Sequence, residues 1–259
     1  MSTRAMRQAL LRHQDTVVHW VMTTALFSAA AFAVTKTLGN SPQLALPPAA
    51  EAISTPVNAS LPNAAPPAPT WDMANIANSR VDNWVKRFTT TFKNDFAASL
   101  SRGENYIPMI TAKLAERNMP QELAYLPLIE SEYKPKARSR VAAVGLWQFM
   151  SGTARNFGLS VGRKVDERTN PAKATDAALT YLSELYDRFG SWYLAAAAYN
   201  SGPGTISKAM KRTLGRSTGT DADFYAIAKH LPAETREYVP KLIAAARIGK
   251  DPGQYGLAD

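Results

Sequence analysis

From about residue 71 onward, apolar residues recur at spacings of three and four, which is the pattern of amphipathic helices. One long helix, ending near Gly103, is predicted from a stripe made of Val81, Val85, Phe88, Phe92, Phe96 and Leu100. The same spacing predicts further helices over residues 107–117, 123–130, 171–189, 192–200, 205–212, 223–229 and 234–248. No alternating strand pattern competes over any useful length, so the predicted fold class is all-α.

Local signals mark several helix boundaries. Asn170-Pro171 is typical of an N-cap followed by proline at the first helical position, and Gly190 is typical of a C-terminal stop. Ser191 is predicted to cap the helix of residues 192–200, whose four consecutive alanines favour close packing. Pro120 is predicted to lie in the first turn of the helix that carries residues 123–130.

The N-terminal part of the chain follows different patterns. Residues 17–35 contain no Lys, Arg, Asp or Glu and are long enough to cross a bilayer as a helix. The basic flank of residues 1–16 predicts a cytoplasmic N-terminus, with the remainder outside the inner membrane in the periplasm. A cleaved signal peptide is the alternative, because Ala31-Phe32-Ala33 fits a small-x-small cleavage site. Residues 36–70 hold eight of the 17 prolines and predict a disordered Pro/Ala-rich linker.

Composition narrows the chemistry. The chain has no cysteine and three histidines, of which only His230 lies in the helical part. Thiolate metal sites, a cysteine nucleophile and a histidine-based triad are therefore not expected, and neither is a cofactor or metal. The net charge of +9 favours an anionic partner. Because the charges are dispersed, an acidic extracytoplasmic polymer fits better than nucleic acid.

Glu130 is the strongest candidate for a chemical role. It ends the apolar run Leu123–Ile129 and shares a helical face with Leu126 and Leu123. A carboxylate desolvated there should have a raised pKa, as a general acid requires. The alternative is an ordinary surface glutamate. Glu132 would lie about 200° around an ideal helix, so it offers no paired carboxylate, and Asp166 or Glu167 could pair with Glu130 only through folding.

Four blocks of residues carry a family resemblance. They are Glu130-Ser131 with Pro135, Ala137 and Ser139; Gly145-Leu146-Trp147-Gln148; Ala198-Tyr199-Asn200-Ser201-Gly202; and Leu231-Pro232-Ala233-Glu234-Thr235 leading to Tyr238-Val239-Pro240. In this order they resemble the soluble lytic transglycosylase-like (SLT) domain of the lysozyme-like, goose-type superfamily. Trp147, where the broader family usually has Met, favours the D-type membrane-bound branch. The resemblance implies a catalytic domain at 107–249, a helical N-terminal extension at 71–106 and a C-terminal tail at 250–259.

The resemblance implies cleavage of the β-1,4 bond between N-acetylmuramic acid and N-acetylglucosamine in peptidoglycan. Glu130 would protonate the leaving oxygen and then accept the proton of the muramoyl 6-hydroxyl, closing a 1,6-anhydro ring. Ser139 matches a serine that positions the N-acetyl group. Gln148, Tyr199 and Asn200 match groove residues, and Tyr238 matches a tyrosine near the acid.

Other interpretations remain open at this point. Tyr199 and Tyr238 are also compatible with core packing, Asn200 with capping its helix, and Ser139 with a turn. Trp147 is expected to pack beneath the groove. The basic run that follows Glu130 is either a solvated edge or an attractor of peptide-stem carboxylates; it comprises Lys134, Lys136, Arg138 and Arg140.

The competing functions are a hydrolytic muramidase of goose-lysozyme type and a non-catalytic peptidoglycan-binding scaffold. The expected partners are peptidoglycan strands and, through the N-terminal helix, the inner membrane. A role beside a secretion or pilus machine is compatible with such a tether.

Overall fold

The structure is a computed structural model that describes residues 72–257. The predicted cytoplasmic segment, the membrane helix or signal sequence and the linker therefore lie outside the described residues. Among residues 72–257 no helix combines the length and apolar character needed to cross a bilayer.

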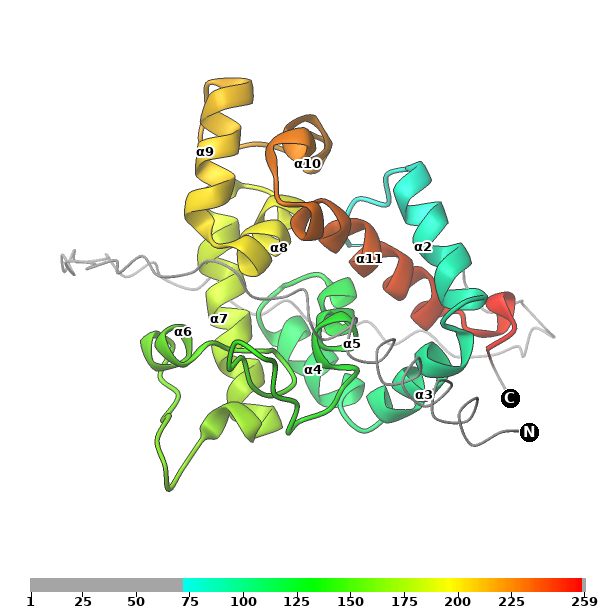
Figure 1. Ribbon diagram of the computed structural model, residues 1–259, viewed down its shortest axis with the longest axis vertical. Helices are drawn as coiled ribbons and strands as arrows, with labels where there is room; N and C mark the ends of the chain where they lie inside the picture. Colours follow the sequence, from blue (N-terminus) through cyan, green and yellow to red (C-terminus); the bar gives the residue numbers. More distant parts are fainter. Residues whose placement is uncertain (1–71, 258–259) are drawn as a thin grey trace, which may run out of the picture. The chain divides into compact units, whose positions relative to one another are not determined.

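The described part of the chain is all-α, as predicted (Figure 1). Its β-type pairing is limited to isolated bridges such as Arg138 with Val144. The α-helices are α2 (Ser79–Thr89), α3 (Lys93–Gly103), α4 (Ile107–Glu116), α5 (Leu126–Ser131), α6 (Ser151–Asn156), α7 (Pro171–Phe189), α8 (Trp192–Ser201), α9 (Pro203–Leu214), α10 (Asp221–Ile227) and α11 (Ala233–Lys250). Short 3₁₀ helices are η1 (Gln121–Tyr125), η2 (Glu167–Thr169), η3 (Ala228–His230) and η4 (Gly253–Tyr255).

Helix α8 lies at the centre, packed against α7 on one side and α11 on another (Figure 1). The alanines of residues 195–198 are fully buried, so their small side chains let the neighbouring helices approach closely. The boundaries predicted at Asn170, Gly190 and Ser191 are confirmed. The Asn170 side chain accepts the Lys173 N–H, the Ser191 side chain accepts the Leu194 N–H, and Gly190 has φ 71°.

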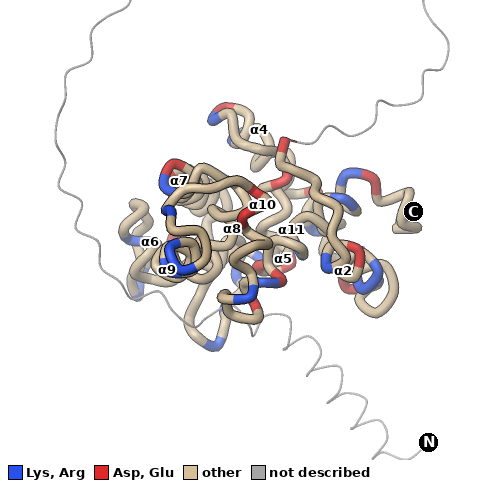
Figure 2. Tube along the Cα trace, turned by 90° about the horizontal axis from the view of Figure 1, so that it is seen from above, with Lys and Arg blue, Asp and Glu red and all other residues tan. Residues whose placement is uncertain are grey.

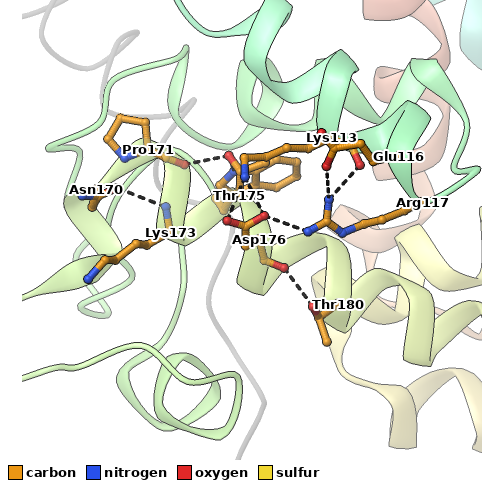
Figure 3. Close-up of polar contacts among 10 residues, drawn as sticks. Lys113, Glu116, Arg117, Asn170, Pro171, Lys173, Thr175, Asp176 and Thr180 are labelled. Carbon is orange, nitrogen blue, oxygen red and sulfur yellow. Dashed lines mark hydrogen bonds and ion pairs between the residues drawn. The ribbon is translucent and has the colours of Figure 1, made fainter.

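Helix α4 is joined to α7 through charged side chains (Figure 3). Asp176 on α7 accepts hydrogen bonds from Lys113 at 2.8 Å and from Arg117 at 2.8 Å. Elsewhere, Lys and Arg occur on several helices, including α2, α6 and α9, and do not gather on one of them (Figure 2). This distribution agrees with the dispersed charge read from the sequence.

The prediction of one long helix ending near Gly103 was wrong in its continuity. Helix α2 stops at Thr89, and Thr90 leaves helical geometry at φ −124° and ψ −83°. The Thr89 and Thr90 hydroxyls donate to the carbonyls of Val85 and Lys86. Such back-bonding by threonine competes with the helical ladder. The break lets α3 fold back so that the rings of Phe88 and Phe96 stack at 4.5 Å.

The predicted helix starting at Pro120 is also interrupted. Residues 121–125 form the 3₁₀ helix η1, and α5 begins only at Leu126. Pro127 has no N–H to donate to the carbonyl four residues back, so an α-helical ladder cannot run through it. The Leu126 N–H bonds the carbonyl of Leu123 three residues back.

Residues 72–106 share one hydrophobic core with the remainder of the described chain. Met73, Phe88 and Phe96 all belong to it. Helix α2 packs on α11, where Glu237 accepts the Trp84 indole N–H at 2.8 Å and an Arg80 hydrogen bond at 2.7 Å. The N-terminal helices therefore support the helix that carries Tyr238.

Candidate active site

Glu130 lies in the last turn of α5 with only 5% of its surface exposed. The apolar run before it is buried in the core, as the sequence predicted. Burial raises the pKa of Glu130 to about 7, against a hydrogen bond from Tyr238 that lowers it. The charge of Glu234 raises this pKa further and that of Lys241 lowers it. The carboxyl is therefore poised to hold or release a proton near neutral pH.

Helix α11 brings Tyr238 directly to the acid. Tyr238 is 3% exposed, and its hydroxyl donates to Oε1 of Glu130. Burial, together with the Glu130 charge, holds the pKa of Tyr238 well above its usual range, so the phenol stays a proton-bearing donor. Within residues 72–257 no hydrogen bond occupies Oε2 of Glu130, which leaves that oxygen for a reacting group.

The loop after α5 is anchored to the acid's helix. The Ser131 hydroxyl donates to the carbonyl of Leu146 at 2.8 Å. Gly145 has φ 89°, and a Cβ there would lie 1.9 Å from the Arg168 carbonyl oxygen, so only glycine fits. The buried Arg168 guanidinium donates to the carbonyls of Ala142 and Phe149, each at 3.0 Å. The block of residues 145–148 is thus held at a fixed place beside α5.

Gln148 and Ser139 both lie on this loop. Gln148 has φ 47°, and its Nε2 donates to the Gly145 carbonyl at 2.8 Å. Its Oε1 is buried and has no hydrogen-bond partner among the described residues. Ser139 is half-buried, and its hydroxyl accepts the Ala143 N–H at 3.0 Å. This bond agrees with the turn role considered as an alternative in the sequence analysis. No hydrogen bond joins it to Glu130 in residues 72–257.

Helix α8 contributes Tyr199 and Asn200. The Tyr199 hydroxyl donates to the Trp147 carbonyl at 2.8 Å, and burial beside Glu130 holds the pKa of Tyr199 well above its usual range. Asn200 donates to Glu234 at 3.0 Å and accepts the Thr235 hydroxyl at 2.7 Å. It therefore links α8 to α11, and its side chain does not serve as a cap of its own helix.

Trp147 is a packing residue. It is fully buried and donates its indole N–H to Thr175 at 3.0 Å.

Two charged residues near the acid had no role in the sequence-based interpretation. Glu234 and Lys241 both act on the pKa of Glu130, Glu234 from the first turn of α11 and Lys241 one turn beyond Tyr238. Glu234 lies in the fourth sequence block, so the sequence singled out its position but not its proximity to Glu130. Lys241, whose Nζ lies 4.6 Å from the Trp84 ring centroid, left no signal in the sequence.

The other carboxylates considered as partners of Glu130 are engaged elsewhere. Asp166 receives two hydrogen bonds from Arg168, which lower its pKa, and Glu167 receives one from Lys173 at 2.5 Å. Helix α5 ends at Ser131, and Glu132 follows in the left-handed region at φ 55°. Glu132 therefore does not lie on the helix as the angular argument supposed. Among residues 72–257 no group of three or more His, Asp or Glu side chains could hold a metal ion.

Comparison with known proteins gives concordant matches. Residues 107–221 match the model of the Transglycosylase SLT domain. Over 157 residues the chain is 41% identical to membrane-bound lytic murein transglycosylase D of Escherichia coli (strain K12), covering 60% of this chain and 34% of that protein. It is 32% identical over 187 residues to the soluble lytic murein transglycosylase of the same strain, covering 67% of this chain and 26% of that protein.

Among solved structures, the 70 kDa soluble lytic transglycosylase of Escherichia coli aligns with a TM-score of 0.47 and 26% identity. That alignment covers 60% of this chain and 26% of the other. The chain spans about a third of the length of lytic murein transglycosylase D. The resemblance read from the four sequence blocks is confirmed, since residues 107–221 match the transglycosylase SLT domain and the chain is similar to lytic murein transglycosylases.

Proposed function

We propose that this protein is a peptidoglycan lytic transglycosylase that cleaves the β-1,4 bond between N-acetylmuramic acid and N-acetylglucosamine. The observation that carries the proposal is Glu130, a buried carboxyl with a pKa of about 7, one oxygen of which accepts from Tyr238 while the other accepts from no group in the described part of the chain. The match of residues 107–221 to the SLT domain, and the similarity to proteins named lytic murein transglycosylases, support it. The lysozyme-like assignment of the fold is part of the same proposal.

In the first step Glu130 gives its proton to the glycosidic oxygen. The bond between that oxygen and C1 of the muramoyl residue breaks, and positive charge develops at C1. A carboxyl with a pKa near the working pH is the most effective donor, because it is both protonated and acidic enough to transfer. Tyr238 then stabilises the carboxylate that forms by continuing to donate to Oε1.

In the second step the Glu130 carboxylate accepts the proton of the muramoyl 6-hydroxyl. That oxygen bonds to C1 and closes the 1,6-anhydro ring, so atoms and protons balance without water. One carboxylate acting twice fits a site in which Asp166, Glu167 and Glu132 hold other partners.

The remaining residues form the walls of the site. Gln148 is proposed to contact a sugar hydroxyl or amide with Oε1, the acceptor that has no partner among the described residues. Tyr199 ties the loop to α8 and Asn200 ties α8 to α11, and Tyr199 lies close enough to Glu130 for the Glu130 charge to raise its pKa. Ser139 is proposed to meet the N-acetyl group, which would supply its carbonyl to the cationic centre.

Muropeptide mass spectrometry with purified sacculi tests the proposal. The wild type should release 1,6-anhydromuropeptides, and Glu130→Gln should lose activity by about 10²-fold to 10⁴-fold, the usual contribution of a general acid. The matched control is Glu116→Gln, because the Glu116 side chain is 70% exposed on α4 and should tolerate the change. Unaltered solubilisation by Glu130→Gln would refute a catalytic function.

Hydrolysis is the second candidate, and one observation favours it. Glu234 is close enough to Glu130 to raise its pKa, so a second carboxylate does stand in the site, where a muramidase would need one to activate water. Because Glu234 already accepts a hydrogen bond from Asn200, we prefer the single-carboxylate route. Reducing ends without anhydro sugars in the same mass spectra would identify the muramidase. Strand binding without release of any product would identify the scaffold.

The proposed location is the inner membrane, with the catalytic domain in the periplasm and residues 17–35 as the anchor. The uncharged composition of that segment supports the proposal. Carbonate-washed membranes should retain the full chain, and its mass should include the N-terminal segment. Recovery of a periplasmic form beginning after Ala33 would show a cleaved signal. A secretion or pilus partner would be tested by co-purification of the tethered chain with such a machine.

A further inference from the structure

A pocket is lined in part by the loop that follows the acid. The pocket has a volume of about 420 Å³, within the range of small-ligand sites. Its walls are Arg102, Asn105 and Tyr106, from the end of α3 to the start of α4, and residues 133–137, which follow α5. We call it the basic pocket. Neither the family resemblance nor the mechanism above gives it a role.

The basic pocket carries an excess of positive charge. Arg102, Lys134 and Lys136 line it, and a single carboxylate, Glu132, offsets two of them at 3.1 Å and 2.5 Å. The Arg102 and Lys134 side chains remain 34% and 44% exposed, so a ligand can still reach them. Lys136 is exposed and forms no ion pair with any acid of residues 72–257. A ligand that brings one or more carboxylates would therefore complete the charge balance.

The lining also contains an apolar surface. The half-buried ring of Tyr106 lies in the wall with Pro135, and behind it the fully buried ring of Tyr133 stacks at 6.4 Å with planes 14° apart. Asn105 adds an amide that can bind a peptide group. Cations beside an aromatic wall suit an amphipathic anion with a peptide or aliphatic body. They do not suit a neutral sugar chain, which has no charge to offer.

The pocket and the candidate active site share one loop. Ala137 lines the pocket, and its carbonyl accepts the Gly145 N–H at 2.9 Å on the active-site side. The carbonyl of Gly145 accepts a hydrogen bond from the Gln148 side chain. Ser139 follows Ala137 by two residues in the same loop. Arg102 also fixes the end of α5 by donating to the Glu132 carbonyl at 2.8 Å. A group bound in the pocket therefore lies against the same loop that carries residues proposed to hold the sugar.

We propose that the basic pocket binds the carboxylate-bearing peptide stem of the wall strand. The inference rests on the proposed function, because it names a second part of the same substrate. In such a strand the sugars next to the scissile bond are uncharged, and the free carboxylates are on the peptide. The structure also divides the basic run of residues 134–140. Lys134 and Lys136 face the pocket, whereas Arg138 lies 3.6 Å from Asp166.

The test compares cleavage of peptide-bearing strands with cleavage of strands stripped of peptides by an amidase. The measured quantity is the ratio of the two rates. Wild type should favour peptide-bearing strands, and Lys134→Gln combined with Lys136→Gln should lower the ratio by about tenfold, as expected for two partly exposed charge pairs. Lys136→Gln alone, which breaks no ion pair, should lower it by about threefold. The effect should weaken in high salt.

The matched control is Arg163→Gln combined with Lys164→Gln, which removes the same charge from an exposed turn. It should keep the wild-type ratio. A direct measurement accompanies the rates, namely calorimetric binding of a synthetic stem tripeptide with free carboxylates and of the same tripeptide amidated. Only the free acid should bind, and the Lys134/Lys136 double variant should bind it about tenfold more weakly.

The outcomes separate the two proposals. If wild type cleaves both strands at equal rates and the variants do not differ, the inference fails and the proposed function stands. If no strand is cleaved, the proposed function fails and tripeptide binding alone decides the pocket. Equal binding of the free and amidated tripeptides would overturn the inference, because charge would then play no part.

Discussion

Replacing Tyr238 by Phe removes the one hydrogen bond that Glu130 accepts in the described part of the chain. The phenol donates to the carboxylate, so it stabilises the charged form and lowers the pKa that burial raises. The variant keeps the ring and its packing on α11, and it loses only the hydroxyl. The pKa of Glu130 should therefore rise above its wild-type value of about 7.

The size of the change follows from the strength of a buried hydrogen bond to a charge. Such bonds contribute about 1.5 to 3 kcal/mol, and each pKa unit corresponds to about 1.36 kcal/mol. In the wild type the phenol also bonds to the protonated carboxyl, so only part of this energy distinguishes the two protonation states. Its loss should therefore raise the pKa of Glu130 by about one unit. Glu130 must be protonated to begin the reaction. The alkaline limb of the kcat/KM profile should accordingly move from a midpoint near 7 to about 8.

The assay is the rate of anhydromuropeptide release from sacculi between pH 5 and pH 10. Tyr199→Phe is the control, because it removes a buried hydroxyl that donates to the Trp147 carbonyl and not to Glu130. It should leave the midpoint in place, whatever it does to the rate. An alkaline limb that stays at the wild-type pH in Tyr238→Phe would refute the assignment of Glu130 as the titrating acid stabilised by Tyr238.

Two further predictions concern stability. Folding raises the pKa of Glu130 from 4.5 to about 7, so its contribution to the free energy of unfolding is fully present below pH 4.5 and is lost as the pH rises through 7. At about 1.36 kcal/mol per pKa unit, the free energy of unfolding of the wild type should fall by about 3 kcal/mol between pH 5 and pH 8 because of Glu130, and Glu130→Gln should lack this fall in urea melts. The same pH dependence of the free energy of unfolding in wild type and variant would contradict this. Lys250→Met should lower the free energy of unfolding by about 3 kcal/mol, because it leaves the buried Glu122 without its cation. Lys173→Met, which breaks an exposed pair, should cost under about 1 kcal/mol, and similar losses for both would refute the argument.

Helix boundaries were predictable where a local side chain determines them. Asn170, Ser191 and Gly190 act within a turn of their own position, so the sequence contains the whole interaction. The breaks at Thr90 and Leu126 are also local in cause, but their signals were weaker than the apolar spacing that ran across them. Three consecutive threonines and Pro127 were the available signs. The spacing identified the buried face correctly and extended each helix too far.

The residue types of the candidate site were predictable and the family resemblance placed Tyr238 near the acid, but the residue patterns alone did not give the pairings. Glu130 and Tyr238 are 108 positions apart, and only the packing of α11 on α5 brings them together. The same holds for Asn200 and Glu234, which join α8 to α11. The basic pocket depends on α3 folding back against the loop after α5, which the prediction of one continuous helix could not provide.

The two buried glutamates on the segment from η1 to α5 show how the structure separates a supporting residue from a reactive one. Glu122 is fully buried, but it accepts the N–H groups of Asp72 and Met73 and pairs with Lys250. Both of its carboxylate oxygens therefore have partners, and it joins residues near both ends of the described chain to the core. Glu130 is almost equally buried and receives one neutral donor, while Glu234 opposes its ionisation. Burial alone therefore does not identify the acid. What marks Glu130 is burial without an ion pair to any cation of residues 72–257, which keeps its proton available to a substrate.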